Sequence, residues 1–170
     1  MQLQERLEQL PDRQGVPAVR TYDLWNEQVD FIEEEEPFDM PAVFLEFMPY
    51  KWTTLSGAVQ QAAVTVRLHV VTPWKGSSRK GSRYQQQSLE RFSLLEEISA
   101  CLHDFKGDNG KVCFDMFRRT ASDTNHNHAE VVEDVEEYTF RAVERLWKSV
   151  ICISRCRAMT RSSALALIIL

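Results

Sequence analysis

Residues 123–130 form the densest group of side chains that could bind a metal. The group comprises Asp123, Asn125, His126, Asn127, His128 and Glu130. Asp-x-Asn-x-Asn from Asp123 matches the first half of a calcium loop, with Asp134 at the twelfth position, but His128 stands where the sharp turn needs glycine. Zinc needs three or four ligands, and His-x-His supplies two. The pattern favours a polar connection whose side chains bond to their own backbone, with a small ligand- or metal-binding regulatory domain as the alternative.

Two cysteines, Cys152 and Cys156, stand beside Arg155 and Arg157, and neighbouring positive charge can activate a thiolate. No histidine accompanies them, and the chain contains no Gly-x-Ser-x-Gly, phosphate loop, dinucleotide fingerprint or His-Glu-x-x-His motif. The sequence therefore predicts no catalytic residue, metal ligand or cofactor, and a protein that is not an enzyme.

Two loops of opposite charge are the more informative feature. Residues 30–39 carry six acids and no base, and Glu33, Glu34, Glu35 and Glu36 form their centre. Residues 73–83 carry no acid, and their bases are Lys75, Arg79, Lys80 and Arg83. Such loops could meet in a head-to-tail contact between copies, which closes into a ring if the rotation allows. The alternative is two solvated loops, since charge runs commonly serve solubility.

Hydrophobic periodicity predicts the elements that would hold these loops. Leucines at helical spacing predict a short helix over residues 2–10, ended by Pro11. Alternation predicts strands over residues 42–47, 63–72, 111–120 and 135–145, and residues 16–32 contain an extended segment. Ser88 is the expected cap of a second helix, whose apolar stripe runs from Leu89 to Phe105 and ends before Gly107. Residues 121–134 are expected to form a polar connection.

These elements predict an α+β fold. A mainly antiparallel sheet of four to five strands would carry the N-terminal helix and the second, amphipathic helix on one face.

Charge divides the chain into two unlike parts. The 170 residues have a formal net charge of −5. Residues 1–147 hold 25 acids and 16 bases, whereas residues 148–170 hold four bases and no acid. We therefore expect a domain over residues 1–147 followed by a basic extension over residues 148–170 with an apolar end. The overall acidity argues against nucleic acid as the main partner.

No apolar run approaches the length of about 18 residues that predicts a spanning helix, so no membrane association is expected. The first residues lack the pattern of a secretory signal, which predicts a cytosolic protein with reduced cysteines.

The order of these patterns resembles the tail-completion proteins of tailed bacteriophages and prophages, a family that includes tail terminators and head-tail joining proteins. The resemblance covers residues 41–143 and rests on PAVFLEF, Trp52, VQQAAVTVRLHVVTPW, SLERFSLLEEISACLHDF and VVEDVEEYTFRAV. It implies a non-enzymatic structural protein that forms a ring, commonly of six copies, at the head-tail junction. The implied partners are further copies, the tail-tube protein and a neck or head-completion protein. The implied location is the host cytoplasm during assembly and then the virion tail.

Two tryptophans, Trp52 and Trp74, are candidate apolar anchors at contacts between copies. The alternative is that each closes one end of the core under a loop.

Residues 148–170 match nothing in the family pattern. A docking peptide, an unordered tail and the product of a disturbed reading frame remain open interpretations.

Overall fold

The fold is described by a computed structural model for residues 2–10, 18–29, 37–126 and 129–146. Two helices are present in these ranges, α1 (Gln2–Glu8) and α2 (Gln85–Leu102). The eight strands are β1 (Thr21–Leu24), β2 (Ala42–Phe47), β3 (Thr53–Ser56), β4 (Val59–Pro73), β5 (Gly107–Asp108), β6 (Val112–Phe114), β7 (Arg118–Asn125) and β8 (Val131–Arg145). The bounds predicted for the strand over residues 42–47 are confirmed by β2.

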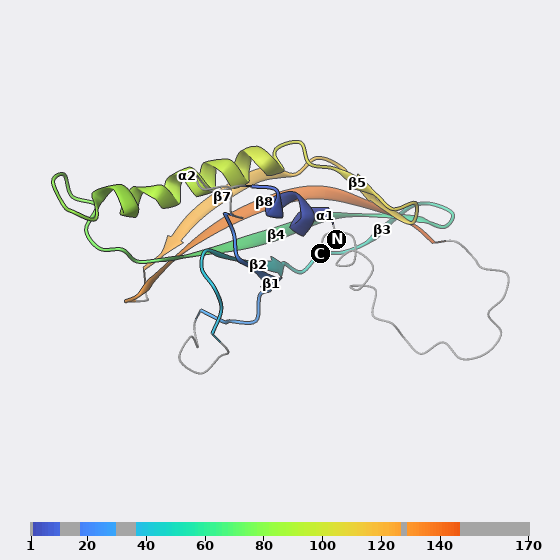
Figure 1. The fold of residues 1–170 in the computed structure, drawn as a ribbon. Coiled ribbons are helices and arrows are strands. Elements are labelled where there is room, and N and C mark those ends of the chain that lie inside the picture. Colours follow the sequence, from blue (N-terminus) through green and yellow to red (C-terminus); the bar gives the residue numbers. More distant parts are fainter. Residues whose placement is uncertain (1, 11–17, 30–36, 127–128, 147–170) are drawn as a thin grey trace.

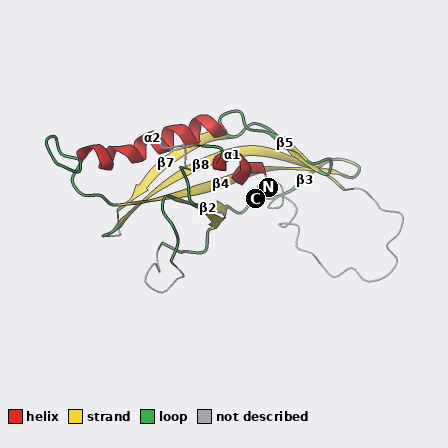
Figure 2. Ribbon diagram, viewed as in Figure 1, coloured by secondary structure: helices red, strands yellow, loops and turns green. Residues whose placement is uncertain are grey.

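All eight strands belong to one sheet with the order β1-β2-β4-β8-β6-β5, in which β3 also pairs with β4 and β7 with β8. The centre is the antiparallel pair of β4 and β8, each 15 residues long, which stay in register from end to end. At one edge β1 runs parallel to β2, so the sheet is mixed. Figures 1 and 2 show that the sheet is strongly curved and that both helices lie over the same face.

The predicted α+β fold with four to five mainly antiparallel strands is wrong. Strand accounts for 45% of the structure and helix for 19%, in a mixed, curled sheet of eight strands. The short strands β3 and β5 have little apolar pattern because they are largely exposed. They join the sheet through backbone pairing with a neighbour, which periodicity does not detect.

The polar segment over residues 121–134 is likewise mostly strand. The predicted strand over residues 111–120 is two strands, β6 and β7, and β7 continues to Asn125 before β8 starts at Val131. The first six residues of β7 are exposed, so the apolar alternation that identifies a half-buried strand is missing.

The main core lies between the helices and the sheet. The strands contribute alternate apolar residues such as Val66, Leu68 and Tyr138, and α1 contributes Leu3 and Leu7. The second helix buries Leu94, Leu95, Ile98 and Leu102. Aromatic rings close one end of this core, among them Phe105, Phe114, Phe117 and Phe140.

The first half of α2 departs from the prediction. Leu89 and Phe92 were expected in the apolar stripe, but they are 40% and 47% exposed. The expected cap, Ser88, lies inside the helix, and Tyr84 occupies the N-cap position without a side-chain bond. A polar contact with the sheet, from Arg91 to Asp134, holds this half of α2 in place.

A smaller apolar cluster lies on the opposite face of the sheet. Its buried members are Val29, Ala42, Phe44, Val71 and Val131, and Trp25, Phe38 and Met40 pack against them. This cluster attaches the segment between β1 and β2 to the face that the helices do not cover.

Burial of Tyr138 predicts a loss of stability at alkaline pH. Burial raises the pKa of Tyr138 to about 12, whereas the phenol of an unfolded chain has a pKa near 10. As the pH rises above about 10 the unfolded state releases this proton first, so the free energy of unfolding should fall by about 2 kcal/mol by pH 12. Burial raises the pKa of Tyr22 as well, in the same direction.

Urea unfolding at pH 8 and at pH 11.5 measures this effect. Tyr138→Phe should show a smaller decrease than the parent protein, because one of the two buried phenols is gone. An equal decrease in both proteins would contradict the assignment to Tyr138.

Candidate functional site

The basic loop, residues 74–84, connects β4 to α2 at the end of the sheet where α2 begins (Figure 1). The Trp74 N–H donates to the Glu130 carbonyl at 2.7 Å, and the Ser88 hydroxyl donates to the Gly76 carbonyl at 2.8 Å. Gly76 has a φ of +109°, and an added Cβ there would lie 2.8 Å from the Tyr84 ring. These contacts fix the path of the loop at both of its ends.

The four bases of this loop are all exposed, namely Lys75, Arg79, Lys80 and Arg83. The Arg83 guanidinium lies over the Tyr84 ring, 4.5 Å from its centroid. None of the four forms an ion pair with the described residues. Within the described residues the loop therefore presents four exposed cations without an ionic partner.

A cavity of about 450 Å³ opens beside the basic loop. Trp74, which is 47% exposed, forms one wall, and Val132 of β8 and Leu94 of α2 contribute apolar surface. Met40 and Pro41, which precede β2, close the other side. Such a concave and partly apolar site beside an exposed tryptophan suits an anchoring side chain of a partner.

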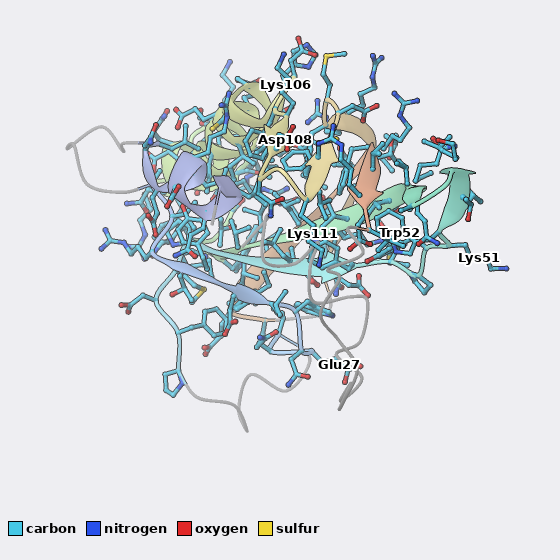
Figure 3. The ribbon with its side chains drawn as sticks, turned by 90° about the vertical axis from the view of Figure 1, so that its right-hand side faces the viewer. Glu27, Lys51, Trp52, Lys106, Asp108 and Lys111 are labelled. Carbon is cyan, nitrogen blue, oxygen red and sulfur yellow. The ribbon has the colours of Figure 1, made fainter. Side chains whose placement is uncertain are left out.

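The acidic loop is described only at its flanks, because Glu33, Glu34, Glu35 and Glu36 lie outside the described residues. Asp23 and Glu27 precede this loop, Asp39 is its last residue, and all three are exposed. Figure 3 shows Glu27 on the side of the sheet opposite α2. Glu27 therefore lies on the face away from α2, whereas the basic loop leads into α2.

The two candidate tryptophans lie at opposite ends of β4. Trp52 precedes β3, which pairs with β4 near Val59, whereas Trp74 follows the last residue of β4. Trp52 is half-buried against the main core and meets Tyr50 edge to face, with ring centroids 6.0 Å apart. Figure 3 shows Trp52 beside Lys51 at the β3 end of the molecule. The structure therefore does not bring Trp52 and Trp74 into one site.

A histidine centre lies on the face opposite the helices, and sequence reasoning did not identify it. His69 is buried, with Nδ1 2.6 Å from Glu133 and Nε2 3.2 Å from Glu46. The Trp25 ring stacks on the imidazole with centroids 3.9 Å apart and planes 5° apart. The two carboxylates lie at opposite ring nitrogens and so cannot converge on one metal ion through this histidine. The centre joins β2, β4 and β8 to the segment that follows β1.

A polar clamp joins α2 to the sheet on the other face. Arg91 donates from Nη1 to both carboxylate oxygens of Asp134, at 2.9 and 3.0 Å, and Thr124 donates to Asp134 at 2.7 Å. Arg119 and Ser122 donate in the same way to Glu136, at 3.2 and 2.7 Å. Both carboxylates are buried on β8. This polar clamp replaces apolar packing under the first half of α2.

The partial calcium-loop spacing that starts at Asp123 does not bring its described residues together. Asp123 and Asn125 belong to β7 and oppose Val135 and Glu133, so they lie on the other face of the sheet from Asp134. His126 is exposed after the end of β7, and Asn127 and His128 lie outside the described residues. Within the described ranges no group of three potential ligands is suited to a metal ion. Asp123 and Asn125, among the described residues of this segment, therefore do not share a face with Asp134.

Cysteine chemistry finds no support in the described part of the chain either. Cys101 and Cys113 are free thiols that are partly buried, and burial raises the pKa of the Cys101 thiol. A raised pKa lowers the thiolate fraction, and the thiolate is the nucleophile. Cys152 and Cys156 lie outside the described residues.

Comparison of the sequence with models of protein families, and with curated protein sequences, finds no significant match. No helix in the described ranges has the length and apolar character needed to cross a bilayer.

Proposed function

We propose that this chain is a non-enzymatic structural protein of a phage or prophage tail, which forms a ring of identical copies that completes the tail at the head-tail junction. The partners are further copies, the tail-tube protein and a neck or head-completion protein. Its action is binding and steric termination of tube growth, in the host cytoplasm during assembly and then in the virion tail. The proposal starts from the resemblance of residues 41–143 to tail-completion proteins.

The observation that carries the proposal is the separation of charge across the sheet. The basic loop leads from the end of β4 to α2, whereas the exposed acid Glu27 lies on the side of the sheet opposite α2. Complementary patches on different faces favour a head-to-tail contact, because one copy can offer its basic face to the acidic face of the next. A head-to-tail contact repeated with the correct rotation closes into a ring.

Reversing two charges of the basic loop should weaken self-association. Arg79→Glu combined with Lys80→Glu changes the loop charge by four units and leaves the Arg83 contact with Tyr84 intact. The apparent dissociation constant should rise at least tenfold, which corresponds to about 1.4 kcal/mol. Size-exclusion chromatography with light scattering measures this, and parent association should weaken from 50 mM to 500 mM salt.

The matched control is Lys51→Glu combined with Lys106→Glu, which changes the net charge equally at exposed sites outside the basic loop. This control should retain parental association. Equal weakening in both variants would reject the charged-loop contact. A parent protein that stays monomeric at high concentration and has no effect on the growth of purified tail tubes would reject the proposed function.

A further inference from the structure

A groove of about 640 Å³ lies between α2 and β7. Phe92, Leu95 and Glu96 line it from the helix, and Ser122 and Asp123 line it from the strand. Phe92 is 47% exposed and offers an apolar wall. A helix beside a sheet edge, with a groove between them, is a geometry that can receive an extended peptide.

The outer edge of β7 is available for such a peptide. Among the described strands β7 pairs with β8 alone, and its first six residues are exposed. The outer N–H and C=O groups of an edge strand can form a ladder with an added strand.

The charge of the groove selects the chemistry of the peptide. Asp134 and Glu136 on the floor are neutralised by Arg91 and Arg119. Exposed Glu96 adds negative charge at the helix rim, and exposed Asp123 adds negative charge along β7 on the face away from Asp134. Neither acid forms an ion pair with a described residue. The rim therefore favours a basic peptide.

The chain itself contains a peptide of this chemistry. Residues 148–170 carry four bases and no acid. Residues 149–154 read Ser-Val-Ile-Cys-Ile-Ser, which is rich in side chains that favour strands, and Arg155 and Arg157 follow. We propose that residues 149–157 of one copy add as a strand to β7 of a neighbouring copy, with Arg155 and Arg157 on the face of that strand toward α2, near Glu96.

The position at which the described chain leaves the sheet argues for a neighbouring copy. The Leu146 N–H bonds to the Ala58 carbonyl at the end of β4 and β8. Glu136, on the floor of the groove, lies ten residues earlier, and a strand rises about 3.3 Å per residue, so the chain leaves about 33 Å from the groove. To reach the groove of its own copy, the chain would have to turn back over this distance, whereas the peptide of a neighbouring copy would not. This inference rests on the proposed self-association and assigns one of its contacts.

The native thiols of Cys152 and Cys156 allow a direct test in the full chain. Asp123→Cys adds a further thiol on β7, on the face away from α2, where Cys152 and Cys156 would lie if Arg155 and Arg157 face α2. Molecular oxygen accepts two electrons and two protons as two thiols join, so mild oxidation should yield disulfide-linked dimers and larger species on non-reducing gels. Mass spectrometry should find position 123 linked to Cys152 or Cys156 of another copy.

The matched control is Ser56→Cys on β3, an exposed strand at the other end of β4. It should give less than a fifth of the crosslinked product. Arg155→Glu with Arg157→Glu, added to Asp123→Cys, should reduce crosslinking at least fivefold. Equal yields at positions 123 and 56, or a link within a single chain, would overturn the proposal.

Light scattering of the same samples separates this inference from the proposed function. Parental oligomers without the crosslink would overturn the strand addition alone, whereas a monomeric parent would overturn both.

Discussion

Replacing Arg91 with methionine is expected to lower the free energy of unfolding by about 3 to 5 kcal/mol. The Asp134 side chain is only 1% exposed, and Arg91 is its cationic partner, bound through both carboxylate oxygens. Methionine keeps much of the length of the arginine stem but removes the charge, and Thr124 alone then bonds to the carboxylate. A buried carboxylate without its cation is the costly state, because burial removes the water that would otherwise solvate it. Urea unfolding followed by circular dichroism measures the loss.

Arg141→Met is the matched control, since Arg141 and Asp115 form an exposed pair at 3.5 Å. Exposed pairs contribute about 0 to 1 kcal/mol, so this variant should remain close to the parent. Adding Asp134→Asn to Arg91→Met should recover part of the loss, because the neutral amide needs no cation. Similar losses of unfolding free energy in Arg91→Met and Arg141→Met would contradict the claim that burial of Asp134 makes its ion pair important.

Arg91 also affects the candidate site, because it lines the cavity beside Trp74. The first half of α2 contributes little apolar surface to the core, and Ser88 ties this half of the helix to Gly76 in the basic loop. We therefore expect Arg91→Met to increase hydrogen exchange in the first two turns of α2 more than in its last two turns. Uniform exchange along α2 would show that the polar clamp does not hold this half.

The second large effect is expected at the histidine centre. His69→Phe keeps a flat ring beneath Trp25 but removes the bonds to Glu133 and Glu46. A hydrogen bond to a charged group contributes about 1.5 to 3 kcal/mol, and the bond to the buried Glu133 carboxylate is the shorter at 2.6 Å. We expect the free energy of unfolding to fall by about 2 to 3 kcal/mol, as measured by urea unfolding.

A double-mutant cycle between His69→Phe and Glu133→Gln isolates this interaction. The coupling should exceed about 1 kcal/mol, and the same cycle with Glu46→Gln should give a smaller value, because Glu46 is more exposed and more distant. Equal coupling in the two cycles would contradict the assignment.

The histidine centre also bears on the proposed contact between copies. It holds Trp25, which follows β1 and precedes the exposed acid Glu27 by two residues. Loss of the centre should release Trp25 from the sheet, which a red shift of tryptophan fluorescence would report. The variant Trp25→Leu lacks this tryptophan, so comparison with it identifies the part of the fluorescence that comes from Trp25.

Alternation in the sequence correctly predicted which side chains share a face in the central strands. Val66, Leu68 and Val70 lie in the main core, while Arg67 and His69 lie on the other face. A strand of period two that buries one face leaves this alternation in its sequence, as β4 does over residues 62–68.

The rest of the sheet could not be predicted in this way. β3 is exposed along its length and β7 over its first six residues, so neither strand needs apolar residues at alternate positions. Backbone hydrogen bonds to β4 and β8 hold them, and nearly every residue type can supply these bonds. Because these strands were not predicted, the expected sheet had four to five strands, whereas the structure has eight among the described residues.

The candidate site was predicted in part. Charge composition identified the basic loop with Lys75, Arg79, Lys80 and Arg83, and its bases are exposed. The cavity beside Trp74 was not predicted, because it requires α2, β8 and the segment before β2 to meet.

The sequence by itself therefore determined the chemistry of each segment: the opposite charges of the two loops, the apolar faces of β2 and β4, and the basic character of residues 148–170. Only the tertiary structure decided which partners meet. Glu133 reaches His69, and Asp134 reaches Arg91, because β8 pairs with β4 in one register. A shift of one residue would exchange the two faces of β8. Local periodicity carries no information about register, which depends on contacts between residues distant in the chain.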